Sequence, residues 1–419
     1  MIGSTKTAFF HHPKMILRAA GKLAKRIETT LRYKYDQKHD RPMGGDVNKY
    51  FKQLFRAFIV LGIAWASGAP AEDIVRTFDA RPKFEKSRVE LKKLYSIDAT
   101  RFQVLNREPW AMIASKIDFD SHNRLYIMDS WAAAISVFDE DGRYLRSFGR
   151  KGQGPGEFYN PSMLFIKNDR IHVPQSFGLE FKIVDLEGRF LSIQRIPKHL
   201  ENLFRFFVEG DDLYVFSGKL DSSFTHLDFV LRRFEGGRWE REKILLTSPY
   251  SPGFNMGKGF VEIVFPAVLK DGRIVFPEDA ARRYSLIEYD PTGAHRQAFG
   301  RTYQVHPFSE KARGQLDELY KGQIKQGMKI PASPAAIRNI FRDHRNNIWV
   351  VVGETGEDTD DPEFENTVDV FGPDGGWLYA FKTKFVSRNS ICHDGKIFTL
   401  RPSDPVSESQ TIDVVAIRY

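Results

Sequence analysis

Short runs of alternating apolar and polar residues, separated by polar turns, follow one another from about residue 112 to the end of the chain. The clearest set is formed by residues 117–120, 125–129, 134–139 and 144–149. Their period of two, together with their content of Val, Ile, Phe and Tyr, predicts β-strands. Asp141-Gly142 precedes the fourth run, and this dipeptide supplies the positive φ angles of a tight hairpin. The pattern therefore predicts four strands in up-and-down order.

The second run of this unit recurs five more times along the chain. Its anchors are separated by 46, 42, 61, 74 and 49 residues and are Leu125, Ile171, Leu213, Ile274, Ile348 and Ile397. Turn dipeptides fall at matching places, among them Asp271-Gly272, Asp374-Gly375 and Asp394-Gly395. Six copies of a four-stranded unit of about 45 residues predict a six-bladed β-propeller.

The last copy reaches the end of the chain after only three strands. We expect the run 89–95, which precedes the first copy, to pair with residues 412–418 and complete the sixth blade. This pairing would join the first and last segments and remove an exposed sheet edge. The predicted fold is therefore all-β. It is a six-bladed propeller of four-stranded blades over residues 89–419, closed by an N-terminal strand and carrying one short helical insertion.

A Gly-rich tail ends the first unit, with the sequence FGRKGQGPGEF over residues 148–158. Together with the strands of the first unit, it resembles the bacterial exported six-bladed β-propeller proteins related to NHL repeats. The resemblance covers about residues 85–419 but is close only in the first blade, and the Gly-rich tail is its specific part. It implies an exported propeller of a kind that often has no assigned activity. The lipoprotein cysteine of many relatives is missing here.

The same tail invites a phosphate-binding interpretation. A phosphate loop needs Gly-Lys-Ser/Thr at the start of a helix, whereas here Lys151 is followed by glycine and then by a strand. Pro155 and Gly156 instead suit the two central positions of a type II turn. We expect a connection between blades rather than a phosphate site.

The net charge of +8 does not belong to the predicted propeller. Residues 1–71 hold 13 of the 62 Lys and Arg residues and 4 of the 54 Asp and Glu residues, which gives them a net charge of +9. The remaining residues therefore carry 49 positive and 50 negative side chains, a net charge of −1. A near-neutral domain gives no electrostatic basis for binding phosphates, so no nucleic-acid partner is predicted.

Residues 43–71 have the three parts of a secretory signal peptide. A basic flank precedes an apolar stretch at 57–66, and Ala69-Pro70-Ala71 offers a cleavage site after Ala71. Ten apolar residues span only about 15 Å as a helix, so no stable membrane span is expected after cleavage. A linker at 72–88 and a periplasmic or secreted propeller follow. Residues 1–42 keep two readings: a mis-called start, or a basic amphipathic helix at the membrane surface.

The candidate chemistry lies on the innermost strand of each blade, near the mouth of a central channel, and the innermost strand of the first blade is expected at 112–119. Its polar members are the ligand-binding candidates Lys116, Arg205, Glu262, Arg338, Asn339, Arg388 and Asn389. Cations outnumber carboxylates by four to one, which argues against calcium and indicates an anionic or carbonyl-rich ligand. The alternative is that these side chains are hydrated or paired with one another. No zinc-binding or nucleophile motif occurs, so no metal, cofactor or catalytic residue is predicted.

Two insertions supply further candidates. Residues 246–259 form a Gly-, Pro- and aromatic-rich loop, and residues 303–335 include a polar helical stretch at 310–326. Long excursions from a rigid scaffold often bind ligands, so Tyr250, Phe254 and Tyr320 are the aromatic candidates. The helix has an alternative role as a cover for a blade edge.

These observations predict a monomeric exported propeller that binds or scaffolds and does not catalyse. Its partner is an unknown protein, peptide or carbohydrate. The alternative is a divergent propeller hydrolase or lyase whose site lies in the channel, with Glu262 and Asn339 as its essential residues.

Overall fold

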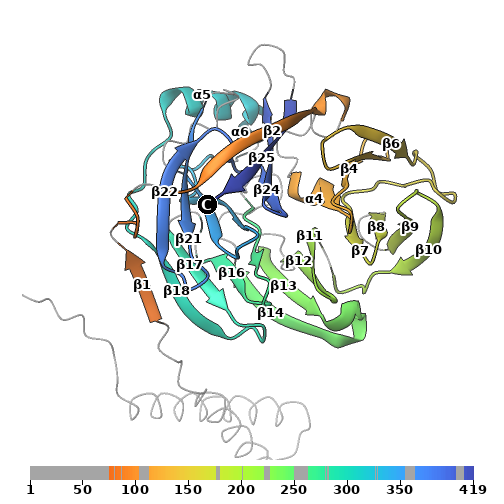
Figure 1. The fold of residues 1–419 in the computed structure, drawn as a ribbon, viewed down its shortest axis with the longest axis horizontal. Coiled ribbons are helices and arrows are strands. Elements are labelled where there is room, and N and C mark those ends of the chain that lie inside the picture. The colour runs from red at the N-terminus through yellow and green to blue at the C-terminus, as the bar shows by residue number, and fades with distance from the viewer. Residues whose placement is uncertain are drawn as a thin grey trace, which may run out of the picture. The chain divides into compact units, whose positions relative to one another are not determined.

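The computed structural model describes residues 75–79, 81–85, 87–102, 113–175, 180–200, 202–220, 227–249, 263–278, 280, 283–325, 327, 329–353, 364–402 and 410–419. The chain divides into two units, residues 1–73 and 74–419, and every described residue belongs to the second. This unit contains six sheets arranged as blades around a centre (Figure 1). The predicted six-bladed propeller is confirmed. The signal-peptide and leader predictions lie outside the described residues.

Blades one to three each hold four strands, which follow one another in the sheet in sequence order. Blade one contains β3 (Ile117–Phe119), β4 (Leu125–Asp129), β5 (Ala134–Phe138) and β6 (Tyr144–Phe148). Blade two contains β7 (Phe165–Lys167), β8 (Arg170–Gln175), β9 (Glu180–Asp185) and β10 (Phe190–Arg195). Blade three contains β11 (Leu203–Glu209), β12 (Asp212–Leu220), β13 (Leu227–Phe234) and β14 (Glu242–Pro249).

Blades four to six follow the same order, with additions from the N-terminal segment. Blade four contains β15 (Ala267–Val268), β16 (Ile274–Pro277), β17 (Ser285–Tyr289) and β18 (His295–Arg301). Blade five contains β19 (Ile337–Arg342), β20 (Ile348–Val352), β21 (Asn366–Phe371) and β22 (Trp377–Thr383). Blade six contains β23 (Ser390–His393), β24 (Lys396–Pro402) and β25 (Gln410–Arg418).

Ring closure takes place in blade six, as predicted. Strand β2 (Glu90–Asp98) pairs antiparallel with β25, from Glu90 opposite Arg418 to Asp98 opposite Thr411. Ser96 Oγ donates to Asp413 Oδ1 at 2.7 Å, which adds a side-chain link across the same pair of strands. The predicted donor strand for the last blade is therefore confirmed, and a ladder of backbone hydrogen bonds joins the strand ahead of blade one to the last strand of the chain.

The segment at 72–88, for which only a linker was expected, carries a strand. Strand β1 (Val75–Asp79) pairs parallel with β18 and gives blade four a fifth strand (Figure 1). Asp79 Oδ2 then accepts the backbone N–H of Trp377 in blade five at 3.1 Å. Further along, Lys83 N–H donates to the Trp377 carbonyl at 2.8 Å. The segment thus crosses the rims of blades four and five before β2 enters blade six.

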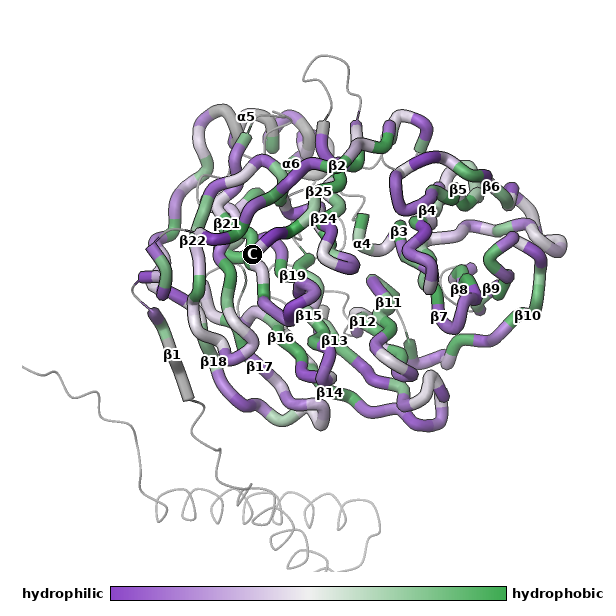
Figure 2. The backbone as a smooth tube through the Cα atoms, in the orientation of Figure 1, coloured by the Kyte–Doolittle hydropathy of each residue, from purple (hydrophilic) through white to green (hydrophobic). Residues whose placement is uncertain are grey.

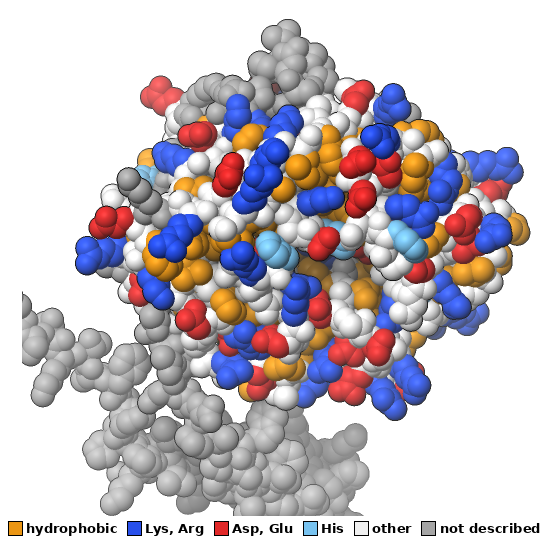
Figure 3. All heavy atoms as spheres, viewed as in Figure 1, with side chains coloured by type: hydrophobic (Ala, Val, Ile, Leu, Met, Phe, Trp, Pro, Cys, Tyr) orange, Lys and Arg blue, Asp and Glu red, His pale blue; other side chains and the backbone are white. Residues whose placement is uncertain are grey.

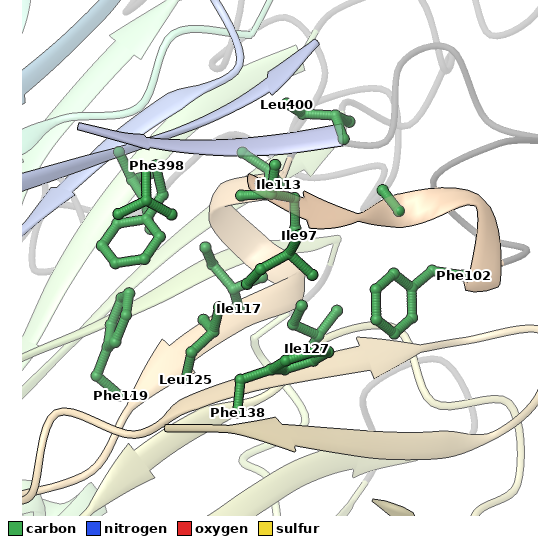
Figure 4. Packing of buried hydrophobic residues seen from close by; sticks show 14 residues of the cluster. Ile97, Phe102, Ile113, Ile117, Phe119, Leu125, Ile127, Phe138, Phe398 and Leu400 are labelled. Carbon is green, nitrogen blue, oxygen red and sulfur yellow. The ribbon is translucent and has the colours of Figure 1, made fainter. Parts of the chain in front are cut away.

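The core is divided among the interfaces between blades. Six buried clusters are present, each drawn from two neighbouring blades. Figure 4 shows the one between blades six and one, where Phe398 faces Phe119 and Ile117. Both faces of a blade are buried in this way, so its middle strands are apolar on both sides, and β4 and β20 are buried at every residue. In Figure 2 the hydrophilic residues gather in the connections around the rim.

The short helices are α4 (Ile113–Lys116), α5 (Glu310–Leu319) and α6 (Lys321–Lys325), and the 3₁₀ turns are η1 (Ala99–Arg101), η3 (Glu235–Gly237) and η4 (Trp239–Arg241). Helices α5 and α6 confirm the predicted helical insertion. Helix α4 replaces the first half of a strand expected at 112–119. No helix in the described ranges combines the length and the apolar character needed to cross a membrane.

The Gly-rich tail forms the predicted turn. Glu157 N–H donates to the Gly154 carbonyl at 3.1 Å, and Gly156 has a φ of +72°, as a type II turn requires. The Glu157 carboxylate accepts the Gly154 N–H at 2.9 Å, and Lys182 Nζ donates to the Gly154 carbonyl at 3.0 Å. The loop's own carboxylate takes a backbone donor that a phosphate would need.

Candidate functional site

Helix α4 lies in the centre of the ring and fills one end of the channel. It belongs to blade one, yet it contacts β11 of blade three and β23 of blade six (Figure 1). Ile113 is fully buried, and Ala114 packs against two of the buried clusters. A strand over these residues, as the sequence predicted, would leave the middle of the ring empty. The helical turn instead places apolar side chains there, which close packing favours.

Lys116, a predicted ligand-binding residue, holds this helix in position. Its ammonium donates to Ser130 Oγ at 2.9 Å and to the Ser162 carbonyl at 2.6 Å, and the residue is only 7% exposed. The two bonds connect α4 to blade one and to the entry of blade two. The structure therefore shows Lys116 in contacts that support the wall of the channel.

A buried acid and a buried base face the interior beyond α4. Asp118 on β3 accepts the backbone N–H groups of Phe119 at 2.9 Å and Ile166 at 2.6 Å. Arg205 on β11 lies with its guanidinium carbon 4.5 Å from the ring centre of Phe207 and 5.2 Å from that of Phe265. Both charged residues are partly buried, and both lie on inner strands, which border the hollow at the centre of the ring.

The electrostatics of this hollow follow from burial. Burial raises the pKa of Asp118 to about 6, while the two backbone donors and the charge of Arg205 oppose the rise. Burial likewise lowers the pKa of Arg205 to about 10, and the charge of Asp118 opposes the fall. Both groups are therefore ionised at neutral pH. Among the described residues, the Arg205 guanidinium makes no hydrogen bond and no ion pair, and its Nε is closed off from solvent.

An ion pair spans the opposite end of the channel. Arg342, the last residue of β19, binds the carboxylate of Glu209, the last residue of β11, so blades three and five are linked across blade four. Burial raises the pKa of Glu209, and the charges of Arg342 and Lys270 oppose the rise. Figure 3 shows a hollow at the middle of one face, ringed by charged side chains of both signs.

A histidine from blade six completes the described wall. The ring of His393 stacks on Phe119 with 3.9 Å between ring centres and 7° between planes. Its Nε2 lies 3.0 Å from Asn123 Oδ1. Burial lowers the pKa of His393 to about 4, so the imidazole is neutral at pH 7. Burial also raises the pKa of the neighbouring Cys392 thiol to about 12, which keeps it protonated.

Four other predicted channel residues lie on or next to the inner strands of blades five and six. Asn339 Nδ2 donates to the carbonyls of Ser390 at 2.8 Å and Ser387 at 3.4 Å, so its amide joins blades five and six. Arg338 is buried, and Arg388 and Asn389 are partly buried, in the segments where β19 and β23 begin.

Of the three predicted aromatic residues on the insertions, Tyr320 is within the described residues. Tyr320 connects α5 and α6, since its N–H donates to the Leu316 carbonyl at 2.9 Å. Glu262, Tyr250 and Phe254 lie outside the described residues. Among the predicted residues that the structure describes, Arg205 lies close enough to Asp118 for the charge of that carboxylate to act on it.

Sequence reasoning missed Asp118, Glu209, Arg342 and His393. A signal was present for Asp118, because it is a charged residue between two apolar residues of an inner strand. Burying a charge is costly unless it is compensated, so a charge in such a run points to a compensating partner. Which residue provides that partner depends on the ring. Within the described ranges, no group of three or more His, Cys, Asp or Glu side chains is placed to hold a metal ion.

Comparison with known proteins supports the architecture. Residues 108–231 match the family model DUF5128, described as a 6-bladed beta-propeller. The predicted resemblance to six-bladed propeller proteins is thereby confirmed. No curated protein matches the chain.

Solved structures with a similar fold include proteins with and without a stated activity. A DUF4221 family member from Bacteroides vulgatus shares 13% identity with a TM-score of 0.48, covering 79% of this chain and 98% of its own. A putative exported protein from Bacteroides fragilis shares 14% sequence identity with a TM-score of 0.46, and the match covers 82% of this chain and 99% of that protein. A gluconolactonase from Xanthomonas campestris shares 9% sequence identity with a TM-score of 0.38, and the match covers 83% of this chain and 98% of that enzyme. Likeness at this level carries no argument about activity.

Proposed function

We propose that this chain is an exported binding protein that holds an anionic or carbonyl-rich ligand in the central channel and does not transform it. The ligand is a peptide or a carbohydrate that presents a carboxylate to Arg205. The signal sequence at 43–71 supports export. The observation that carries the binding proposal is the state of Arg205, which is enclosed in the hollow without a hydrogen-bonded partner among the described residues.

Arg205 is prepared for such a ligand by its surroundings. The rings of Phe207 and Phe265 lie 4.5 Å and 5.2 Å from the guanidinium carbon, which restricts the orientation of the planar group. A guanidinium held in one plane matches a carboxylate with two parallel hydrogen bonds. The low dielectric of an enclosed site strengthens these bonds relative to water. Asp118 limits the cost of keeping Arg205 charged there without forming an ion pair with it in the described structure.

The two ends of the channel differ in a way that suits entry from one side. Apolar residues of α4 fill the end where the inner strands begin. The other end carries Glu209 and Arg342, whose side chains are 21% and 27% exposed. A partly exposed pair of this kind contributes little to stability, about 0–1 kcal/mol, so opening it costs little. A ligand then reaches Arg205 past the ion pair.

Matched ligands test the proposal directly. Calorimetric titration compares an N-acetylated tripeptide with a free carboxylate and the same peptide as its C-terminal amide, and likewise a glucuronate-containing disaccharide and its methyl ester. We expect one carboxylate to bind at least about tenfold more tightly than its neutral partner, as expected for a charge-assisted bidentate contact. Arg205→Lys keeps the charge and removes the bidentate geometry, so it abolishes this preference. Arg189→Lys, a change at an exposed arginine, leaves the preference intact.

Other outcomes contradict the proposal. Equal binding of acid and neutral forms by the wild-type protein would rule out recognition through Arg205. Sustained turnover of lactones, esters or glycosides would favour the hydrolase or lyase alternative, especially if Asn339→Ala and Glu262→Ala abolish it. In the structure the Asn339 side-chain amide donates to two backbone carbonyls of the segment that leads into blade six. Its replacement is therefore expected to weaken the contact between blades five and six.

A further inference from the structure

A second hollow lies away from the channel, between blades two and three. It has a volume of about 330 Å³. Its walls come from all four strands of blade two and, on the other side, from β12 and the turn that contains Trp239. None of the channel residues Asp118, Arg205, Glu209 or Arg342 lines it. An engineered cavity of about 150 Å³ holds one benzene ring, so this one has room for about two fused rings and a small substituent.

Aromatic rings form most of the pocket's apolar wall. His172 stacks on Phe165 with 4.6 Å between ring centres and 12° between planes. It meets Phe181 edge-on, at 6.0 Å and 88°. Trp239 lies nearly parallel to Phe181 at 5.9 Å and 16°. Burial lowers the pKa of His172 to about 4, with smaller contributions from two nearby cations, so it acts as a neutral ring at pH 7. Flat apolar groups pack favourably against such walls.

The polar part of the lining combines two cations with the neutral amides of Asn168 and Gln194. Lys167 and Arg170 both contribute, and no Asp or Glu lines the pocket. Arg170 is exposed and makes no hydrogen bond or ion pair with any described residue, whereas Lys167 Nζ donates to the Asp211 carbonyl. On the wall, the Trp239 Nε1 donor is closed off from solvent and has no acceptor in the described part of the chain. Positive charge without a carboxylate partner favours an anion.

We infer that this pocket is a binding site for a small aromatic acid, one or two fused rings that carry a carboxylate or sulfonate. The rings pack against the aromatic wall that His172, Phe181 and Trp239 form, and the acid group faces Arg170 at the rim. The aromatic wall recognises the ring system of the ligand through apolar contact, and the cations recognise its negative charge. A neutral ring system fills the same space without that second contribution.

Two naphthalene compounds of nearly equal size test the inference: 2-naphthoate and the uncharged 2-naphthalenemethanol. In calorimetric titrations of the purified protein, we expect one molecule of 2-naphthoate to bind, about tenfold more tightly than the alcohol. Arg170→Gln reduces this ratio to about threefold or less, since it removes the unpaired cation. Arg195→Gln, on the same strand as the lining residue Gln194 but outside the lining, is the matched control and keeps the ratio.

A blocking variant locates the binding. Gln194→Trp adds an indole at the rim of the pocket and lowers the affinity for both compounds at least about tenfold. Arg205→Lys, in the channel, leaves both affinities unchanged, so failure of the channel proposal and failure of this one remain separate results. The inference is overturned if acid and alcohol bind equally, if neither binds, or if Gln194→Trp binds as the wild type does while its urea unfolding curve shows it folded.

Discussion

The channel and the pocket between blades two and three are built from the same kinds of side chain, yet they treat charge differently. In the channel, two arginines face a carboxylate from another blade: Arg205 faces Asp118, and Arg342 binds Glu209. In the pocket, Lys167 and Arg170 have no acidic residue in the lining. The channel thus neutralises much of its own charge, while the pocket presents an uncompensated positive rim. Removing an arginine therefore leaves an unopposed carboxylate in the channel, but not in the pocket.

The two histidines extend the comparison. His393 in the channel and His172 in the pocket both stack on a phenylalanine, and burial lowers the pKa of each to about 4. Only the channel also contains a buried acid, Asp118, whose pKa burial raises to about 6. Lowering the pH therefore changes the stability contribution of the channel in two opposing directions, through His393 and Asp118. It changes that of the pocket in one direction, through His172.

Removing one arginine from each hollow is expected to have the largest effect. Arg205→Met leaves Asp118 without the charge that opposes it and costs about 1–2 kcal/mol in the free energy of unfolding. Arg170→Met, at an exposed position, changes it by about 0.5 kcal/mol or less. Urea unfolding at neutral pH measures both. Asp118→Asn added to Arg205→Met should recover part of the loss. Equal costs for the two single variants would contradict the difference between the hollows.

Acid should act on the pocket through His172. The folded-state pKa of about 4 lies below the unfolded value of 6.5, so this group's stability contribution is present above 6.5 and is lost as the pH falls toward 4. Between about pH 7 and pH 5 the wild type loses about 2 kcal/mol through it. His172→Phe keeps the ring and removes the loss, which gives a flatter stability profile in urea unfolding across that range. An unchanged slope would mean that the imidazole is not kept neutral by burial.

Asp118 should act in the opposite direction. Its folded-state pKa of about 6 lies above the unfolded value of 3.8, so its contribution is present below 3.8 and is lost as the pH rises through 6. Acidification from about pH 7 to pH 5 thus raises the free energy of unfolding by about 1 kcal/mol through Asp118, which offsets part of the decrease caused by His393. Asp118→Asn removes this gain and makes the protein more acid-sensitive. The same urea series measures it, and a shallower slope than wild type would contradict the sign.

The sequence was sufficient for features that repeat or that follow from local chemistry. Six spaced anchors such as Leu125 and Ile348 predicted six blades, and the unfinished last copy predicted that a strand near residue 90 would complete it. The dipeptide Pro155-Gly156 predicted a type II turn, because the φ angles that this turn needs depend only on the two residues at its centre.

The sequence was insufficient where contacts join distant parts of the chain. Strand β1 was missed because its apolar content is low and its pairing partner, β18, lies more than 200 residues away. Helix α4 was missed because residues 113–116 run directly into the alternating residues of β3 and were read as part of the same strand. Its contacts with blades three and six arise only once the ring has closed. Arg205 was selected for its position on an inner strand, but nothing local to it indicated that its charge would face Asp118.

By itself the sequence determined the number of blades, their strand order, their turns and the way the ring closes, because hydrophobic period and turn preferences act over a few residues. Tertiary structure alone decided which charges share a hollow. Closing the ring brings β3, β11, β19 and β23 to one centre, and it places Trp239 of blade three against the open face of blade two. Charge balance depends on distances through space across the ring, and no spacing along the chain encodes those distances.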